Sequence, residues 1–459
     1  MKNNFSGSSV VDAKELIAAT KLSKFSLNSG LSNKTGRTYF IKKFKIRHAA
    51  AFHKIASVFE LPNLLGATRS YIERCFTVIA ESLLELEFVL FSRILAYSEL
   101  FVTSELEVLD ASIKWLSHNF EERKQFGARL LRKVRLHTLP SLQRSLPLKN
   151  NKCREMVEEA HKRSREKPDD RKSRHCSQKN FEALVCGGFV DDDAPKLKVY
   201  SLPEFKARKT LANMKQGRLN FEAVYLKGSV YAFSGRHLSG NDRRVTTVEK
   251  YSLLDNCWTD VIVMPDRRIH YCACAFTDKI FIFGGMIRDS YVSEDTCFEF
   301  DTSNRWFNML APMGVERQQA ACALFQETVV VSGGGAYEGL RHAERYQPWS
   351  NRWARMPDMN FPRKGHKLVA VGSKLYAVGG QQLVGPNFRT CEVYDGQEFT
   401  RIIFPFKMWQ CQALSVGRKI LVLGKNVTAS YDVSDGKWSE ESSKEIFVRG
   451  YSCVKLPYF

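Results

Sequence analysis

Histidine and cysteine are the side chains that could give this sequence catalytic or metal chemistry, and their spacing indicates neither. The histidines His237, His270, His342 and His366 are spread over separate segments, and no HExxH, GxSxG or paired acidic motif accompanies them. The twelve cysteines include no CxxC pair, so neither a zinc site nor a disulfide framework is indicated. We therefore expect no enzymatic activity, no metal and no cofactor, and we interpret the four histidines as surface or packing residues.

Cys272 and Cys274 have the tightest cysteine spacing, within the segment HYCACAF. Side chains two residues apart lie on one face of a β-strand. Two interpretations are open for this pair, buried structural thiols or a reactive or metal-binding pair, and the first is favoured.

The segments that would position these side chains repeat along the second half of the chain. A run of alternating apolar residues that stops on glycine occurs six times, as EALVCGG, SVYAFSG, KIFIFGG, TVVVSGG, SKLYAVGG and KILVLG. Successive glycine stops lie 44 to 50 residues apart. A fixed period of this size marks a repeat architecture.

Each repeat contains the parts of a four-stranded antiparallel sheet. In the third, Arg268 precedes a first strand, KIFIFGG is the second, TCFEF the third, and Trp306 lies on the fourth. Such sheets bury both faces when they stack radially, and glycine allows the close backbone approach near the axis. Aromatic residues recur at the third and fourth strands: Tyr251, Phe300, Tyr346, Tyr394 and Tyr431, followed by Trp258, Trp306, Trp353, Phe399 and Trp438.

The double glycine, the Tyr and Trp spacing and the period of ~50 residues resemble the kelch repeat. The resemblance implies a six-bladed kelch β-propeller over residues 181–459. The first repeat has no strand before EALVCGG, while YSCVKLP follows the last repeat. We therefore expect this C-terminal strand to complete the first blade and close the ring.

Residues 46–148 are predicted to be helical from their apolar spacing of three and four. The segments ASVFELPNLLGATRSYIERCF and SELEVLDASIKWLSHNFEERKQFGARLLRKVRLHTL resemble the BACK domain of kelch-like proteins. Residues 149–180 would form a connecting helix and a basic linker. The expected fold class is thus α + all-β multidomain, a helical BACK-like domain followed by the propeller.

Residues 1–45 are expected to be a partly disordered remnant, in which AKELIAATKL is similar to a late helix of a BTB domain. The whole chain then resembles the BTB-BACK-kelch family with the BTB domain largely missing. The resemblance implies a substrate receptor of a cullin-3 ubiquitin ligase, with cullin-3 binding weakened and a monomeric chain. The alternatives are an actin-binding kelch protein without ligase function, a BTB-less competitor of complete relatives, or a truncated gene sequence.

Composition and charge indicate the cellular compartment and the kinds of partner to expect. No stretch approaches ~20 apolar residues, and no signal peptide is evident, so we expect a cytoplasmic protein, with a nuclear one as the alternative, and no membrane contact. Residues 1–180 hold 33 Lys and Arg against 19 Asp and Glu, so most of the net charge of +20 lies there. A solvated helical surface and linker explain this charge better than nucleic-acid binding.

The family resemblance also implies which loops face a bound protein partner. One set follows the glycine stop, and the other lies about two residues after the arginine that opens each repeat. The arginines themselves, Arg218, Arg268, Arg317, Arg363 and Arg449, are expected to brace adjacent blades at least as readily as to touch a partner. The candidate partner-binding residues are Asn220, Arg236, His237, His270, Met286, Arg288, Gln319, Tyr337, Gln381, Trp409 and Tyr451.

Overall fold

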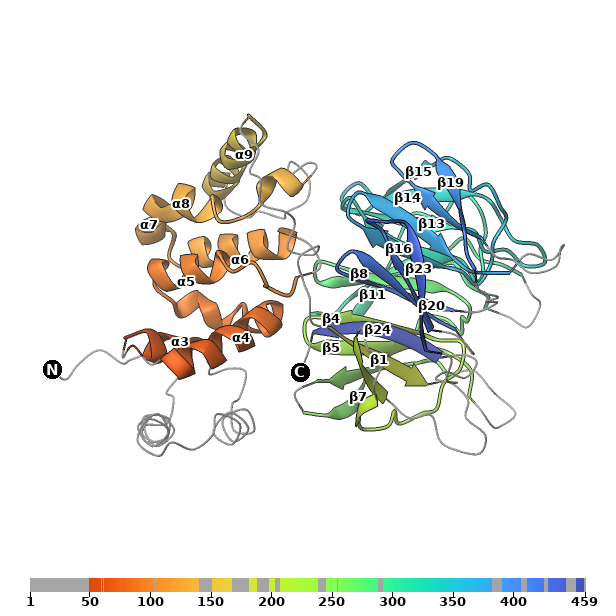
Figure 1. Cartoon of the computed structure of the whole chain (residues 1–459), viewed down its shortest axis with the longest axis horizontal. Coiled ribbons are helices and arrows are strands. Elements are labelled where there is room, and N and C mark those ends of the chain that lie inside the picture. The colour runs from red at the N-terminus through yellow and green to blue at the C-terminus, as the bar shows by residue number, and fades with distance from the viewer. Residues whose placement is uncertain are drawn as a thin grey trace. The chain divides into compact units, whose positions relative to one another are not determined.

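The computed structural model separates into two compact units, a helical one and one that holds all the strands (Figure 1). Each unit is described by itself below. The residues described are 49–58, 60, 62–102, 105–139, 151–166, 181–187, 198–202, 207–237, 245–253, 255–287, 292–381, 390–405, 411–424, 428–442 and 451–457.

The helical unit contains a series of short helices over residues 49–166, in the region where helical periodicity was expected. Three-residue and four-residue 3-10 turns connect some of them, at Ser82–Glu85, Lys124–Phe126 and Leu136–Thr138. The α-helices are α3 (Ala49–Val58), α4 (Pro62–Ile79), α5 (Phe88–Leu95), α6 (Glu105–His118), α7 (Phe120–Arg123), α8 (Gly127–Leu131) and α9 (Asn151–Glu166).

Trp115 on α6 is the centre of the helical core. Its ring stacks on Phe91 of α5 with centroids 5.3 Å apart, and its indole N–H donates to the carbonyl of Leu86 at 2.8 Å. The guanidinium of Arg123 covers the same indole at 4.2 Å. A large aromatic side chain with its polar atom satisfied stabilises the packing of α5 against α6.

Helix α9, which falls in the segment expected to connect the two domains, packs within the helical unit. Cys153 and Val157 are buried, and the thiol of Cys153 lies 3.8 Å from the hydroxyl of Ser117 on α6. At Gly127 on α8 an added Cβ would lie 1.9 Å from the methyl carbon of Met156. Glycine at this position therefore allows α8 and α9 to approach closely.

The strand-containing unit is a β-propeller. Five of its sheets each consist of four consecutive strands: β4 (Glu222–Leu226), β5 (Ser229–Phe233), β6 (Thr247–Ser252) and β7 (Cys257–Val263); β8 (Cys272–Phe276), β9 (Lys279–Phe283), β10 (Cys297–Asp301) and β11 (Trp306–Met309); β12 (Ala321–Phe325), β13 (Thr328–Ser332), β14 (Ala343–Gln347) and β15 (Arg352–Arg355); β16 (Lys367–Val371), β17 (Lys374–Val378), β18 (Thr390–Tyr394) and β19 (Phe399–Ile403); β20 (Gln412–Val416), β21 (Lys419–Leu423), β22 (Thr428–Asp432) and β23 (Lys437–Ser442).

One further sheet is assembled from both ends of this unit. It has the order β24-β1-β2-β3, and its strands are β1 (Phe181–Gly187), β2 (Lys198–Leu202), β3 (Ala207–Thr210) and β24 (Tyr451–Pro457). The C-terminal strand β24 pairs antiparallel with β1 over its whole length, from Phe181 opposite Pro457 to Gly187 opposite Tyr451. Val454 and Leu456 of β24 are buried in a cluster with residues of the β4–β7 sheet.

The apolar core of the propeller lies between neighbouring sheets, where aromatic pairs fill the space. Tyr251 is paired with Trp258, Tyr346 with Trp353, Tyr394 with Phe399 and Tyr431 with Trp438, as the sequence predicts. Their ring centroids lie 4.8 to 5.3 Å apart. Each pair bridges the third and fourth strands of its sheet and stabilises the packing against the next one.

Trp306 lies on the fourth strand, β11, as predicted, but not at the place that matches the other tryptophans. The residue opposite Phe300 is Phe307, whose ring centroid lies 4.9 Å from that of Phe300. Trp306 pairs with Asp301 instead, and 54% of its surface is exposed. The reason is the alternation of side chains along a strand: a shift of one residue turns the side chain to the other face of the sheet.

The glycines that end the second strands are required by close backbone contacts between sheets. Gly284 and Gly333 have φ angles of 61° and 60°. A Cβ at Gly284 would lie 2.4 Å from the carbonyl oxygen of Arg317, and one at Gly333 would lie 2.5 Å from that of Arg363. A side chain would therefore separate the neighbouring sheets at these points.

No helix among the described residues is long and apolar enough to cross a membrane.

Candidate protein-binding face

Four of the arginines that open the repeats are completely buried. Arg218, Arg268, Arg317 and Arg363 have 0% of their surface exposed. Each lies four residues before the first strand of its sheet and donates one guanidinium nitrogen to two backbone carbonyls of that sheet. For Arg317 these are the carbonyls of Gly333 at 2.7 Å and of His342 at 2.9 Å. The arginine thereby fastens the end of the second strand to the start of the third.

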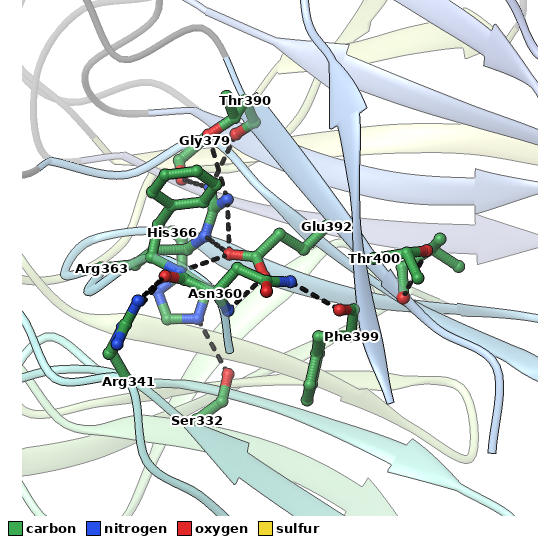
Figure 2. A network of polar contacts seen from close by, with 12 residues as sticks. Ser332, Arg341, Asn360, Arg363, His366, Gly379, Thr390, Glu392, Phe399 and Thr400 are labelled. Atoms are coloured by element: carbon green, nitrogen blue, oxygen red, sulfur yellow. Dashed lines mark hydrogen bonds and ion pairs between the residues drawn. The ribbon is translucent and has the colours of Figure 1, made fainter. Parts of the chain in front are cut away.

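A carboxylate of the third strand neutralises the buried guanidinium in three of these sheets. Glu249 pairs with Arg218 at 2.5 Å, Glu344 with Arg317 at 2.7 Å and Glu392 with Arg363 at 2.9 Å. Figure 2 shows the last of these, in which Glu392 also accepts from Asn360. A buried ion pair of this kind is strongly destabilised when only one partner is removed.

The β8–β11 sheet achieves the same neutralisation with different residues. Phe298 occupies the carboxylate position, and the guanidinium of Arg268 lies 4.7 Å from the centre of its ring. The counter-charge comes from Asp266, two residues before the arginine, which accepts from its Nε at 2.8 Å and from Nη2 at 2.5 Å. The carboxylate thus comes from the link before β8 and not from the third strand, and the charge of Arg268 is still neutralised.

The expectation that these side chains brace adjacent blades is wrong for Arg268 and Arg317. The side-chain hydrogen bonds of each lie within its own sheet or the link before it. The link between neighbouring sheets is made by the backbone instead, where Gly285 N–H donates to the Arg317 carbonyl at 2.7 Å and Gly334 N–H to that of Arg363 at 2.8 Å. Complete burial also removes these arginines from contact with a partner.

The residues that follow the buried arginines form a backbone rim at the same end of the sheets. Asn220, His270 and Gln319, each two residues after its arginine, have φ angles of 51°, 58° and 55°. Gln319 N–H donates to the His270 carbonyl at 2.7 Å, and Gly365 N–H donates to the Gln319 carbonyl at 2.8 Å. These bonds run from one sheet to the next, so the rim is held by the sheets that it joins. All three side chains are half-buried.

The loops after the glycine stops pair with the residue directly after each arginine. Arg236 pairs with Leu219, Met286 with Ile269 and Gln381 with Lys364 in isolated two-residue bridges. The described members of the two predicted sets that these bridges join therefore lie at one end of the sheets. Their exposure differs: Arg236, His237 and Gln381 are half-buried, whereas Met286 is only 5% exposed and offers little surface to a partner.

Tyr337 is the most exposed of the described candidates, with 74% of its surface accessible. It lies on the loop between β13 and β14. The ammonium of Lys364, in the next sheet, donates to the carbonyl of Tyr337 at 2.9 Å and to that of Ala336 at 3.4 Å. Lys364 was not among the predicted site residues. The one signal in the sequence is its charge, because Leu219, Ile269 and Gln318 occupy the same place after the other three buried arginines.

Three of the predicted residues cannot be placed with their side chains. Arg288 and Trp409 lie outside the described residues, and for Tyr451 only the backbone, at the start of β24, is described. The strand β20 begins at Gln412, so counting back four residues gives Met408 as the counterpart of the arginines. By that count the position two residues further is Gln410, one residue beyond Trp409.

His366 and several thiols of the propeller are buried packing groups. His366 is buried, and its Nε2 lies 2.9 Å from the hydroxyl of Ser332 in the neighbouring sheet (Figure 2). Burial holds the pKa of His366 well below its usual value. Burial also raises the pKa of Cys391 to about 11 and that of Cys411 to about 12, which keeps both as inert thiols at neutral pH. Among the described residues, no group of His, Cys, Asp and Glu could hold a metal ion.

Comparison with protein families places both units among known domains. Residues 49–145 match the model of the BACK domain, described as BTB And C-terminal Kelch. The Kelch motif matches residues 316–360, which contain the β12–β15 sheet, and residues 362–401, which contain β16 to β18 and the start of β19. No BTB domain is detected within the 459 residues.

Curated relatives extend the similarity over most of the chain. Kelch-like protein 23 from Homo sapiens is 24% identical over 456 residues, which cover 91% of this chain and 76% of the relative. Kelch-like protein 26 from Danio rerio is 24% identical over 355 residues, covering 72% and 57%. Kelch repeat and BTB domain-containing protein 8 from Homo sapiens is 26% identical over 170 residues, covering 36% and 27%. The chain is thus a homologue of Kelch-like proteins with a BACK domain and Kelch motifs.

Proposed function

We propose that this homologue of the Kelch-like proteins is a non-enzymatic adaptor that captures a protein segment on the rim face of its propeller. The rim face is defined here by Asn220, Arg236, His237, His270, Gln319, Tyr337 and Gln381, with Met286 beneath it and Lys364 beside Tyr337. The observation that carries the proposal is the contrast between a rigid backbone and accessible side chains. Backbone hydrogen bonds between sheets hold the rim, while Tyr337 is exposed on it.

Such an arrangement suits recognition of a protein because little conformational entropy is lost when the partner binds. Exposed tyrosine and arginine side chains on a fixed backbone are the residue types that contribute most to protein interfaces. The buried arginines maintain the backbone and leave the contacts to the rim. The predicted residues Arg288, Trp409 and Tyr451 remain part of the proposal by their place in the sequence.

We further propose that the sheet β24-β1-β2-β3 is the sixth blade and that β24 closes the ring. Support comes from the first strands of the sheets, whose Cα atoms approach within 8 Å from β4 through β8, β12, β16 and β20. β24 makes the same approach to β20 on one side and to β4 on the other. In addition, the hydroxyl of Ser452 on β24 accepts from the N–H of Ala223 on β4 at 3.0 Å. A closed ring leaves no unpaired edge at the join.

The cellular role that we propose is substrate capture for a cullin-3 ubiquitin ligase, acting in the cytoplasm. It rests on the similarity to Kelch-like proteins and not on a described cullin-binding surface. The test is affinity purification of the full chain from cells, with and without proteasome inhibition. Co-purification of cullin-3 together with proteins that accumulate under inhibition would support the role. Recovery of filamentous actin without cullin-3 would contradict it and favour a cytoskeletal role.

A further inference from the structure

Lys364 carries a charge that the described structure does not neutralise. Its ammonium has three donors, and its two acceptors are the neutral carbonyls of Ala336 and Tyr337. None of the ion pairs among the described residues includes Lys364. The residue is half-buried, so the charge is partly removed from water without a counter-ion. A cation held in this way is stabilised by an anion that arrives with a ligand.

The loop that Lys364 holds is fixed at several other points. Gly335 N–H donates to the Gln318 carbonyl at 2.9 Å, and Leu340 N–H to the Gly334 carbonyl at 2.7 Å. At Gly339 an added Cβ would lie 2.7 Å from the backbone nitrogen of Arg363, so the loop lies directly against the start of the next sheet. Tyr337 is therefore an exposed aromatic side chain on a preorganised backbone, which lowers the entropic cost of using it as an anchor.

Two glutamines of the rim lie beside Lys364 through backbone bonds. Gln381 N–H donates to the Lys364 carbonyl at 2.8 Å. Gly365, the residue directly after Lys364, donates its N–H to the Gln319 carbonyl at 2.8 Å. One small area thus combines a cation, an exposed aromatic ring and two amide-bearing residues. The carboxylate next in sequence, Glu338, is exposed and forms no described ion pair with Lys364. We call Gln319, Tyr337, Lys364 and Gln381 the Lys364 corner.

We propose that the Lys364 corner binds an aspartate or glutamate of an extended protein segment, with Tyr337 covering an apolar residue next to that acid. The remaining ammonium donor of Lys364 meets the carboxylate. The backbone of Tyr337 is held close to it, because the same ammonium binds the carbonyl of Tyr337, so the ring lies within reach of the residue next to the acid. The inference rests on the proposed capture of a protein segment by the rim face, and it adds the chemistry of the segment.

The test starts from a phage-displayed library of random twelve-residue peptides selected on the purified full chain. Enriched peptides are expected to share an acidic residue beside an aliphatic or aromatic one. Their affinity, measured by fluorescence polarisation, should fall about 10- to 100-fold in Lys364→Met, as expected for loss of a charge-assisted hydrogen bond. Lys364→Arg should bind within a few-fold of the wild type, and added salt should weaken wild-type binding.

The matched control is Lys374→Met, which removes an exposed lysine from the opposite end of the same sheet and should leave binding unchanged. Enriched peptides without acidic residues, or equal affinity in Lys364→Met, would overturn the inference while leaving capture by the rim intact. If Tyr337→Ala binds such peptides as the wild type does, the inference also fails. If the wild type enriches no peptide at all, the proposed capture of a segment fails and the inference with it.

Discussion

The sheets β12–β15 and β20–β23 have the same strand order, yet they satisfy their buried polar groups differently. In the first, Arg317 and Glu344 form a buried ion pair at 2.7 Å. In the second, the sequence has Met408 at the arginine position and the buried Ala429 at the carboxylate position. Both charges are replaced together by apolar residues. The joint replacement is expected because a buried charge without its partner destabilises the fold more than a well-packed apolar pair does.

The same two sheets differ in the link that leads into them. Ala311 N–H donates to Asn351 at 2.8 Å, and its carbonyl accepts from the indole of Trp353 at 2.9 Å. Gly436 stands at the place of Asn351 in the β20–β23 sheet, so this acceptor is absent there. The link before β16 has Pro357 at the place of Ala311, and proline has no N–H that an asparagine would need to satisfy.

The β4–β7 sheet supports this rule, since Ala212 N–H donates to Asn256 at 3.1 Å and the Trp258 indole donates to the Ala212 carbonyl at 3.1 Å. The link before β16 has Pro357 at that place, and the β16–β19 sheet has no equivalent asparagine. Between these sheets the two positions therefore change together. The comparison teaches that the repeats preserve the charge balance at the buried arginine position and not the individual residues.

The largest loss of stability is expected for the sheet β24-β1-β2-β3, whose strands are not all consecutive in the sequence. Deleting residues 450–459 removes β24 with its buried residues Val454 and Leu456. Each buried aliphatic side chain contributes about 2–5 kcal/mol, and the propeller should lose more than about 10 °C of thermal stability and aggregate. Differential scanning calorimetry would measure the propeller transition. An unchanged transition in the deleted chain would rule out closure of the ring by β24.

The next largest effect concerns the buried ion pair. Arg317→Met leaves Glu344 buried without a counter-charge and two carbonyls without a donor, so the propeller should lose about 3–5 kcal/mol. The double variant R317M/E344A copies the β20–β23 sheet and should lose less than R317M alone. Denaturant titration of the wild type, both single variants and the double variant would give the coupling energy. Additive losses would show that the two residues do not act as a pair.

A smaller effect is expected at the link between sheets. Asn351→Gly removes the acceptor of Ala311 N–H and of the Tyr346 hydroxyl, which should cost about 1–3 kcal/mol. Adding Ala311→Pro in the same chain removes the unsatisfied N–H and should recover part of that loss. Ala311→Pro alone is the control. If the double variant is the least stable of the three by thermal denaturation, the interpretation of Pro357 as a substitute for the asparagine acceptor is wrong.

The smallest effect is a pH dependence at the boundary between sheets. His366 stands where the next sheet has Cys411, and burial keeps its folded pKa well below the usual value of 6.5. The unfolded chain takes up the proton first, so stability is full above about pH 6.5 and falls as the pH drops toward the folded pKa. His366→Cys should reduce this slope in the propeller transition, whatever its cost at neutral pH. An identical slope in the variant would mean that His366 does not titrate as described.

The helical unit offers an internal reference for that measurement. His53 is buried between Thr68 and Tyr97, and burial, with Arg93 and Arg69 nearby, lowers its pKa to about 4. The helical unit should therefore also lose stability between about pH 6.5 and about pH 4. His366→Cys should leave that loss unchanged.

Much of the propeller could be predicted from the sequence because its constraints are local. Glycine stops and alternating strands report directly on backbone conformation, and they identified the second strand of each sheet. The register of the fourth strand was harder, because it depends on the turn before it. Phe307 follows Phe300 by seven residues, as Trp258 follows Tyr251, and this spacing is the signal that would have identified Phe307 over Trp306.

The candidate face was predicted in outline for a different reason. Its residues follow sequence markers, the glycines and the arginines, so their place on one face could be inferred by analogy between repeats. The burial of Met286 and the role of Lys364 could not, because both depend on side chains that meet across two sheets. The role of Asp266 as the counter-charge of Arg268 was not predicted either, although the two residues lie only two positions apart in the sequence.

The central claim is that buried arginines maintain the propeller while the rim captures the partner. Proximity labelling in cells under proteasome inhibition tests it most directly, comparing the wild type, the rim variant Y337A/K364M and the control Lys374→Met. The account predicts that the wild type and the control label the same set of accumulating proteins. It predicts that the rim variant, folded by calorimetry, loses part of that set. Unchanged labelling by the folded rim variant would contradict the claim that partners are captured on this face.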